Sequence, residues 1–394
     1  MSQLRYLTSG ESHGEKLTGI LEGMPSGLDL VAERDIDPYL QERQKGYGRG
    51  RRQQIEQDIA IVSSGVRFGK TLGSPIALTI QNRDWANWQE RMAIQPTDAE
   101  KLRAVTIPRP GHSDFAGGVK YEQERELRNV FERSSARETA MRTAIGAIAL
   151  RMLDELGILH VGFVSAIGLE SIPKQTSLSI TELVTQTLSS QVRAPNEEAS
   201  LRMMVAIDDA RNSGDTLGGI VECRFENLPI GVGSQSHWDR KLDGLIAQAV
   251  LSTQAVKAVE FGEGILMSRS RGSQVHDSFG VQDGVVTRAS NNAGGIEGGM
   301  SNGEPLIVRA FMKPISTLLQ PLRSVDLATG ETADAHIERS DTCAVPALSV
   351  ILQAVIGLTI ASAILETFGG DTMNELKSRV ELRRARTGIT AKHS

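Results

Sequence analysis

A long uncharged run near the C-terminus does most to limit how this chain can fold. From Ala344 to Leu365 no residue carries a charge, and as a helix the run would be long enough to cross a lipid bilayer. A membrane span would be more uniformly apolar than this segment. We therefore expect a helix buried between layers of the protein, and no membrane span. The polar or helix-disturbing residues within the run are Pro346, Ser349, Gln353, Gly357, Thr359 and Ser362.

A second long helix is expected after residue 135. The sequence Ser135-Ala-Arg-Glu138 predicts a capping box, and Gly157 predicts the end of the helix. Alanine and glycine make its flanks narrow, so it can pack closely against a sheet or another helix. Arg133-Ser-Ser135 precedes this helix as Arg339-Ser-Asp341 precedes the uncharged one. We infer two similar halves whose long helices pair in the middle of one domain. The apolar positions at helical spacing are Met141, Ile145, Ile148, Met152 and Leu156.

Apolar segments rich in β-branched residues predict strands, which occur in adjacent groups separated by helices. This arrangement favours an α+β fold built of layers over a doubly wound parallel sheet. A helix is also predicted for Lys241–Val259. The predicted strands are Leu4–Ser9, Ile55–Ser63, Ser74–Ile80, Val161–Leu169, Met203–Asp208, Gly218–Phe225 and Leu306–Lys313.

The segment Arg43–Arg52 carries five basic residues and no acidic one. Its glycines disfavour a helix or a packed strand, so we expect a loop whose backbone and guanidinium groups can approach an anion. By itself such a loop is equally well explained as a solvated surface. The net charge of the chain is −5, which gives no long-range attraction to nucleic acid or to an anionic membrane. A small, multiply charged anion is therefore the expected ligand.

Two histidines lie on glycine-containing turns. Ser12 and His13 are framed by glycines in Gly10–Gly14, and His112 lies between Arg109 and Asp114. A single histidine of this kind is most simply a solvated or capping residue. Two such turns together with an arginine-rich loop indicate an active site for an anion that needs proton transfer.

The cysteines and the N-terminus indicate a reducing compartment. Cys223 and Cys343 are the only cysteines, and they lie far apart without a partner motif, so neither a disulfide framework nor a metal site is predicted. The first residues lack a basic region followed by an apolar run, so no secretory signal is apparent. We expect the cytoplasm.

In seven ordered motifs along nearly the whole chain, the sequence resembles the chorismate synthase family. The resemblance implies a single domain, residues 1–394, with the fold of a β-α-β sandwich whose long buried helices lie between antiparallel sheets, assembled as a homotetramer. The motifs are Gly10-Glu-Ser-His-Gly14, Arg43–Arg52, Arg109-Pro-Gly-His-Ser-Asp114, Arg133-Ser-Ser-Ala-Arg-Glu138, Gly298-Gly-Met-Ser-Asn-Gly303, Lys313-Pro-Ile-Ser-Thr317 and Arg339-Ser-Asp341.

The resemblance also implies the activity. The family is a group of lyases that convert 5-enolpyruvylshikimate 3-phosphate into chorismate and phosphate by anti-1,4-elimination, on the shikimate pathway to aromatic amino acids. Reduced FMN is needed although no net oxidation occurs. In members that regenerate their own flavin with NADPH, Arg43 and Arg49 would touch the nicotinamide nucleotide. The alternative source of reduced flavin is a separate flavin reductase.

Residue roles follow from the same resemblance. His13 would protonate the departing phosphate, His112 would stand near the pyrimidine end of the flavin, and Asp341 would act near flavin N5, where the ring proton is received. The residues expected to contact substrate are Ser12, Arg43, Arg49, Arg52, Arg137 and Arg339. Those expected to hold FMN are Arg133, Ser134, Ser135, Gln254, Ala255, Gly298, Lys313, Pro314, Ile315, Ser316, Thr317 and Arg339.

The chain departs from the family pattern in a few places. Gln353 stands where an acid is expected, and Leu348 is larger than expected. Arg51 lies beside Arg52, so either of the two could reach substrate. One alternative function is a flavin oxidoreductase that passes hydride. Another is an RNA-binding module that uses Arg43–Arg52, although the chain offers no series of stacking aromatics.

Overall fold

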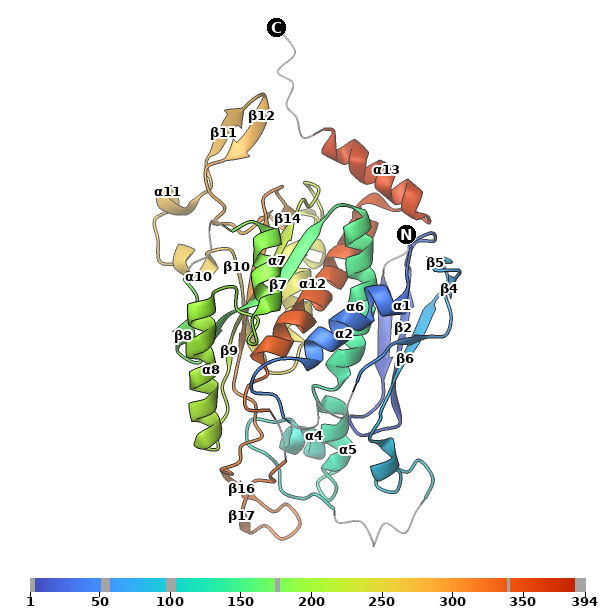
Figure 1. Ribbon diagram of the computed structural model, residues 1–394, viewed down its shortest axis with the longest axis vertical. Coiled ribbons are helices and arrows are strands. Elements are labelled where there is room, and N and C mark those ends of the chain that lie inside the picture. Colours follow the sequence, from blue (N-terminus) through green and yellow to red (C-terminus); the bar gives the residue numbers. More distant parts are fainter. Residues whose placement is uncertain (1–3, 51–56, 97–103, 174–177, 339–340, 387–394) are drawn as a thin grey trace.

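Two long parallel helices form the centre of the protein, α6 (Glu138–Glu155) and α12 (Val345–Phe368) (Figure 1). The computed structural model describes residues 4–50, 57–96, 104–173, 178–338 and 341–386. A Cβ on Gly146 would lie 2.5 Å from the Ala354 backbone oxygen, and Gly357 packs against Leu150 about one turn further along both helices. This close approach confirms the prediction from the narrow flanks. Because the helices run in the same direction, their N-terminal ends lie at the same end of the protein.

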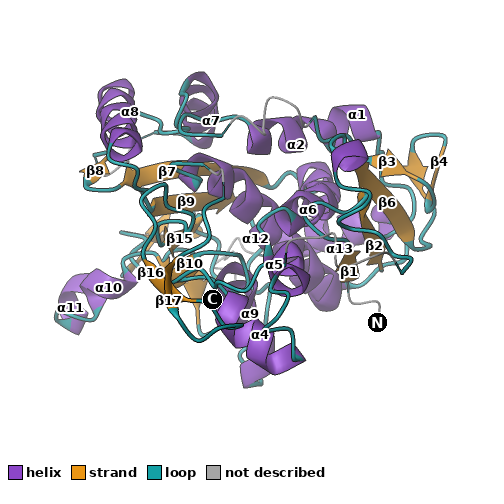
Figure 2. Cartoon of the chain, turned by 90° about the horizontal axis from the view of Figure 1, so that it is seen from below, coloured by secondary structure: helices purple, strands orange, loops and turns teal. Residues whose placement is uncertain are grey.

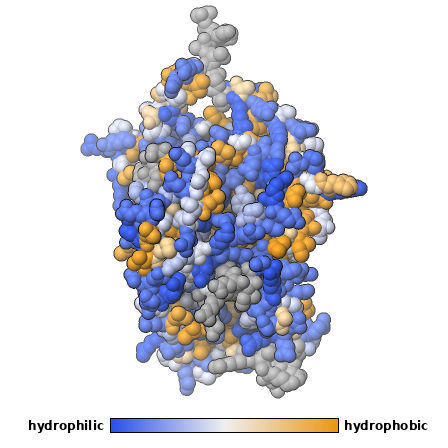
Figure 3. Space-filling view, viewed as in Figure 1, coloured by the Kyte–Doolittle hydropathy of each residue, from blue (hydrophilic) through white to orange (hydrophobic). Residues whose placement is uncertain are grey.

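The uncharged run forms the buried helix that the sequence predicted. α12 is long and apolar enough to cross a membrane, but 89% of its most apolar window is buried inside the protein. The face of the protein shown in Figure 3 is mainly hydrophilic, with hydrophobic residues in scattered patches. We therefore interpret α12 as a core helix.

Two antiparallel sheets enclose the helix pair (Figure 2). α6 packs against the first sheet and α12 against the second, and buried Ile76, Leu78 and Ile80 alternate along one strand of the first sheet as the pleat requires. The α+β sandwich is confirmed. The first sheet has the order β1 (Arg5–Ser9), β2 (Lys16–Glu22), β6 (Ile76–Gln81), β3 (Ile61–Val62). The second has the order β10 (Val256–Phe261), β15 (Leu306–Met312), β9 (Gly219–Glu226), β7 (Leu159–Ile167), β8 (Glu170–Ser171).

The two halves share one strand order. In the first sheet, β1, β2, β3 and β6 follow one another along the chain and lie in the order first, second, fourth, third. In the second sheet, β7, β9, β10 and β15 repeat this order, with β8 added beside β7. In each half the long central helix follows these four strands. The prediction of two similar halves is thus confirmed, and one hydrophobic core runs from Leu4 to Val380.

The remaining elements lie around this sandwich. Short hairpins are formed by β4 (Val66–Arg67) with β5 (Lys70–Thr71), β11 (Phe279–Gln282) with β12 (Val285–Arg288), β13 (Ile296–Glu297) with β14 (Met300–Ser301), and β16 (Arg323–Val325) with β17 (Thr332–Asp334). The other helices are α1 (Ala32–Asp35), α2 (Asp37–Gln44), η1 (Trp85–Asn87), α4 (Asp114–Tyr121), α5 (Arg128–Ser134), α7 (Ile180–Ser189), α8 (Glu197–Asn212), η3 (Trp238–Arg240), α9 (Leu242–Leu251), α10 (Gly264–Met267), α11 (Gly272–Val275) and α13 (Met373–Arg384).

Two secondary-structure predictions were wrong. The strand predicted for Met203–Asp208 lies within α8, where Met203, Ile207 and Ala210 are buried at helical spacing. The helix predicted for Lys241–Val259 ends at Leu251, because the chain turns at Ala255 with a φ of 66° and enters β10. Of the strand predicted for Ile55–Ser63, only β3 forms among residues 57–63, and residues 55 and 56 lie outside the described residues.

The predicted capping box at the start of α6 was also wrong. The helix begins at Glu138 without a side-chain cap. The Glu138 carboxylate accepts a hydrogen bond from Thr8 Oγ1 at 2.8 Å, and the Ser135 hydroxyl donates to Ser12 Oγ at 3.1 Å. Both side chains therefore have tertiary partners, and the Ser135 hydroxyl accepts its local hydrogen bond from the Arg137 amide at 3.2 Å and not from the Glu138 amide.

Candidate active site

The N-terminal ends of α6 and α12 organise the candidate active site. The His13 turn, the His112 turn, the basic loop and the segment Lys313–Thr317 all contact these ends or one another. The positive ends of two helix dipoles point the same way here, because α6 and α12 are parallel. This end of the sandwich therefore favours anions before any charged side chain is counted.

The His13 turn is held by a buried glutamate of α5. The Ser12 amide donates to the Glu132 carbonyl at 3.0 Å, and the His13 amide donates to Glu132 Oε2 at 2.8 Å. His13 Nδ1 lies 2.8 Å from Glu132 Oε1, and the imidazole stacks on Trp88 with 3.7 Å between ring centroids. The turn therefore presents His13 in a fixed orientation.

The His112 turn is built around a buried ion-pair network. Asp114 accepts hydrogen bonds from His112 Nδ1 and, at 2.8 Å, from Arg109 Nε. Burial opposes the charge on Asp114, but the bonds from His112 and Arg109 outweigh it and hold the pKa of Asp114 well below its ordinary value. Arg109 Nη1 also donates to Glu338 Oε2 at 3.0 Å, which ties this turn to the segment that precedes Asp341.

The basic loop is fastened to the segment before α12. Arg49 Nη1 lies 2.6 Å from Asp341 Oδ2, and the Gly50 amide donates to Asp341 Oδ1 at 2.7 Å. The Thr342 amide donates to the Gly48 carbonyl at 2.8 Å, and a Cβ on Gly48 would crowd Cys343. Asp341 thus holds the arginine loop against the start of α12. Predicted substrate residues Arg52 and Arg339, as well as Arg51, lie outside the described residues.

Arg43 and Arg137 share a buried carboxylate. Arg137 Nη1 lies 2.7 Å from both oxygens of Asp58, and Arg43 Nη1 lies 3.5 Å from Asp58 Oδ2. Arg43 also donates to Thr139 Oγ1 and to the Ala136 carbonyl at the start of α6. Two guanidinium groups thus share one carboxylate, which by itself balances only one of their two positive charges.

The predicted cofactor residues at the end of α5 connect the two histidine turns. Arg133 donates to the carbonyl oxygens of Thr8 and Gly10, so it contacts the end of β1. Ser134 Oγ accepts a hydrogen bond from Ser113 Oγ at 2.7 Å, next to His112, while Ser135 contacts Ser12. The hydroxyls of this segment therefore lie between the two turns.

Gln254, Ala255 and Lys313 lie together at the ends of β10 and β15. The Lys313 amide donates to the Ala255 carbonyl at 3.0 Å, and Lys313 Nζ donates to the Gly111 carbonyl of the His112 turn at 2.9 Å. Burial and the neighbouring Lys257 lower the pKa of Lys313. The structure thus brings Lys313 and the Ser316 side chain, which lies near Gly111, to the same place as His112.

Gly298 does not lie with the other predicted cofactor residues. It forms the turn between β13 and β14, where the neighbouring Gly299 carbonyl accepts a hydrogen bond from Leu242 at the start of α9. Gln254 follows the opposite end of the same helix, which contains ten residues and is about 15 Å long. Within one chain, the structure does not bring Gly298 and Gln254 together.

Buried polar atoms without hydrogen-bond partners make the site chemically compatible with a flavin nucleotide. Gln254 Oε1 and Arg49 Nε are buried and have no hydrogen-bond partner among the described residues. Gln254 Oε1 can accept a hydrogen bond from the edge of a flavin ring, and Lys313 supplies a cation suited to a phosphate or a ring oxygen. No group of three or more metal-ligating side chains gathers within the described ranges.

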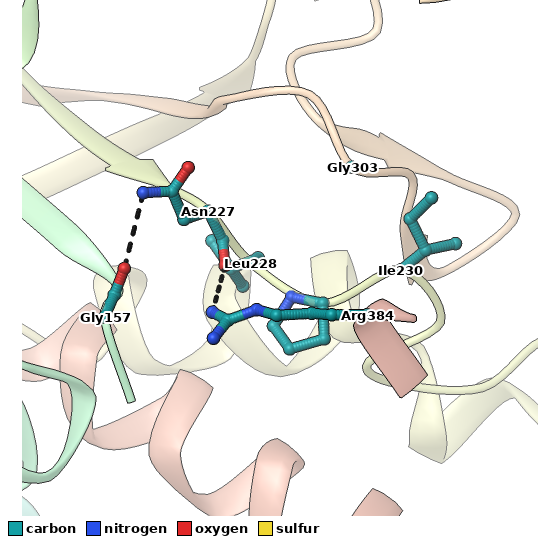
Figure 4. A pocket seen from close by; sticks show the side chains of 7 residues that line it. Gly157, Asn227, Leu228, Ile230, Gly303 and Arg384 are labelled. Atoms are coloured by element: carbon teal, nitrogen blue, oxygen red, sulfur yellow. Dashed lines mark hydrogen bonds between the residues drawn. The ribbon is translucent and has the colours of Figure 1, made fainter. Parts of the chain in front are cut away.

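A cavity of about 450 Å³ lies at the other end of the sandwich (Figure 4). Arg384 donates to the carbonyl oxygens of Leu156 and Asn227 beside it, and Gly157 marks the C-terminal end of α6. None of the predicted site residues lines this cavity. Although a cavity is the usual place to expect a ligand, the predicted histidine turns and arginines lie at the opposite helix ends. The lining residues are Gly157, Asn227, Leu228, Pro229, Ile230, Gly303 and Arg384.

Several residues of the site were missed by sequence reasoning. Asp58, Glu132 and Glu338 are carboxylates that hold predicted arginines or histidines, and Trp88 covers the His13 ring. Each lies far along the chain from its partner, or in a segment without a motif. Nothing in the local sequence could have paired them.

Comparisons with known proteins identify the family of this chain. A family model described as chorismate synthase matches residues 4–365. The chain is 54% identical over 381 residues to the chorismate synthase of Geobacillus sp. (strain WCH70), covering 96% of this chain and 98% of the relative. It is 53% identical over 382 residues to that of Geobacillus kaustophilus (strain HTA426), with the same coverage. A solved structure titled "Crystal Structure of Chorismate Synthase" matches with a TM-score of 0.78 at 40% identity, covering 98% of both chains.

Proposed function

Because this chain belongs to the chorismate synthase family, we propose that it converts 5-enolpyruvylshikimate 3-phosphate into chorismate and phosphate by anti-1,4-elimination. Family membership makes the chain an enzyme of the shikimate pathway. In the proposed reaction the ring C–O bond to phosphate breaks and its electron pair leaves with the phosphate. A ring C–H bond also breaks: its electron pair and that of the existing ring double bond become the two ring double bonds of the product, and the released proton is taken up within the site.

One observation supports this proposal above the others. The parallel N-terminal ends of α6 and α12 carry Arg49, Arg137 and Arg43 together with two histidine turns. A substrate with one phosphate and two carboxylates needs several cations at one place, and guanidinium groups can bind each oxyanion through two hydrogen bonds. We assign substrate binding to Ser12, Arg43, Arg49, Arg52, Arg137 and Arg339.

Catalytic roles are assigned to three residues. His13 donates a proton to the departing phosphate, which makes it a better leaving group. Asp341, between the Arg49 guanidinium and the Gly50 amide, assists removal of the ring proton. His112, bonded to Asp114, influences the charge at the pyrimidine end of the cofactor.

We assign FMN to the neighbouring face of the same site. When bound, reduced FMN supplies electron density transiently to the breaking C–O bond, with no net oxidation. The buried Gln254 amide oxygen and the Lys313 ammonium support this assignment. Gly298 is left outside the set because it lies at the far end of α9. The proposed holders are Arg133, Ser134, Ser135, Gln254, Ala255, Lys313, Pro314, Ile315, Ser316, Thr317 and Arg339.

Several wider properties are part of the proposal. We propose a single domain, assembly as a homotetramer and a cytoplasmic location. Reduced flavin would come either from NADPH bound at Arg43 and Arg49 or from a separate flavin reductase. Comparing turnover with NADPH and oxidised FMN, with and without an added flavin reductase, distinguishes these sources.

The deciding experiment is an anaerobic incubation with substrate and chemically reduced FMN, in which chorismate and phosphate are measured together. We expect equal amounts of the two products and many turnovers for each flavin. Oxidation of one flavin for each product formed would instead identify a hydride-transferring oxidoreductase. An Asp341→Asn variant should lose turnover while still binding FMN, as measured by flavin fluorescence, and an active variant would remove Asp341 from the mechanism.

A further inference from the structure

We propose that Glu132 positions His13 for its reaction by fixing the proton on Nδ1 and directing Nε2 to the substrate. This inference rests on the proposed function, in which His13 protonates the departing phosphate. Glu132 belongs to α5 and does not act on substrate itself. It is therefore a positioning residue, which acts through the imidazole.

Glu132 contacts both the backbone of the His13 turn and the His13 ring. The side chain of Glu132 is only 1% exposed, and that of His13 is 14% exposed. His13 Nδ1 lies 2.8 Å from Oε1 and 3.1 Å from Oε2, while the His13 amide donates to Oε2 at 2.8 Å. The Glu132 carbonyl accepts from the Ser12 amide at 3.0 Å. One residue thus fixes both the backbone of the turn and the ring that it carries.

A carboxylate at Nδ1 decides how the imidazole can react. Since an ionised carboxylate only accepts hydrogen bonds, His13 Nδ1 must carry a proton, and the tautomer is set by this bond. Nε2 is then the ring nitrogen that can exchange a proton with the substrate. When Nε2 is also protonated, the charge of the imidazolium is stabilised by the negative charge of Glu132. The arrangement therefore suits a general acid at Nε2.

Two further residues restrain the Glu132 carboxylate and the His13 ring. Arg128 Nη1 donates to Glu132 Oε1 at 3.2 Å from one turn away on α5, which places a positive charge beside the buried carboxylate. Trp88 stacks on the His13 ring with an interplanar angle of 25°, and the Arg128 guanidinium lies 5.4 Å from the Trp88 ring centroid. The imidazole is thus held at one edge and on one face, so that it cannot rotate freely.

Replacing Glu132 by a neutral side chain of the same shape distinguishes two roles: orienting the His13 ring, and only supporting the backbone of the turn. In Glu132→Gln the amide oxygen can still accept from the His13 backbone amide, but the negative charge is lost. If Glu132 only supported the turn, this variant would behave like wild type once folded. If it positions the ring, kcat should fall about 10²-fold while KM for substrate stays within about twofold.

The test combines a double-mutant cycle with a measurement on the free enzyme. Glu132→Gln should have little further effect in a His13→Ala background, because its contribution passes through the imidazole. Nitrogen NMR of ¹⁵N-histidine-labelled enzyme without substrate and flavin should show the Nδ1–H tautomer of neutral His13 in wild type and a tautomer mixture in Glu132→Gln. Glu198→Gln, which makes the same change at an exposed pair on α8, serves as the control.

Two outcomes would overturn the proposal: equal rate losses from Glu132→Gln in the wild-type and His13→Ala backgrounds, or an unchanged His13 tautomer. If Glu132→Gln does not fold, Arg128→Gln tests the same chain of contacts without touching the turn, and it should lower kcat in the same direction but less. Failure of the wild type to form chorismate would reject the proposed function instead, while the NMR result would still decide whether Glu132 sets the tautomer.

Discussion

Replacing Gly146 by alanine should destabilise the protein although alanine is the better helix former. At this position in α6 a Cβ would lie 2.5 Å from the backbone oxygen of Ala354 and 2.7 Å from its carbonyl carbon, so the two central helices must separate. Overpacking of a tight core costs about 1–3 kcal/mol, and the helix propensity gained offsets about 1 kcal/mol of it. We expect a net loss of up to about 2 kcal/mol in the free energy of unfolding.

The matched control is Gly244→Ala, in α9. There the nearest atoms to a new Cβ are 3.9 Å and 4.0 Å away, so only the propensity gain remains and stability should stay equal or rise. Equilibrium urea unfolding followed by circular dichroism compares the two variants with wild type. If Gly146→Ala is as stable as Gly244→Ala, the backbones of α6 and α12 are not in contact at this position. Parallel packing of the two helices, with their N-terminal ends together, would then be contradicted.

Further predictions test the charges of the site. Asp58→Asn should cost about 3–5 kcal/mol in urea unfolding, because it removes the carboxylate from two buried arginines, whereas Asn at the exposed Asp29 should leave the unfolding midpoint unchanged. In steady-state kinetics, His112→Ala should lower kcat about 10²-fold with KM largely kept, but Arg49→Ala should raise KM as well; equal changes of both constants in both variants would contradict these roles. Because the folded-state pKa of Asp114 is depressed, its contribution to stability is complete above the ordinary value of 3.8 and declines as the pH falls below it; Asp114→Asn should therefore flatten the acid limb of a stability–pH profile.

Local sequence patterns predicted much of the site because its parts are short motifs. The His13 and His112 turns and the arginine loop each carry their chemistry within a few neighbouring residues. Their common location was inferred from residue types alone, and the contacts between Ser12 and Ser135 and between Ser113 and Ser134 now bring the two turns together. The separate location of Gly298 was not predicted, because a sequence motif shows only that a glycine is present and not which end of a helix it packs against.

The sequence by itself determined the elements whose cause is local: the buried helix α12, whose uncharged run can only be buried, and the narrow flanks of α6. Only the tertiary structure decided that these helices run parallel, so that both N-terminal ends face one site. It also decided which acidic residue pairs with which basic residue, as for Glu132 with His13 and Asp58 with Arg137. The physical reason is that a buried charge must find an opposite charge somewhere in the fold, and the distance along the chain between the two is not constrained by any local rule.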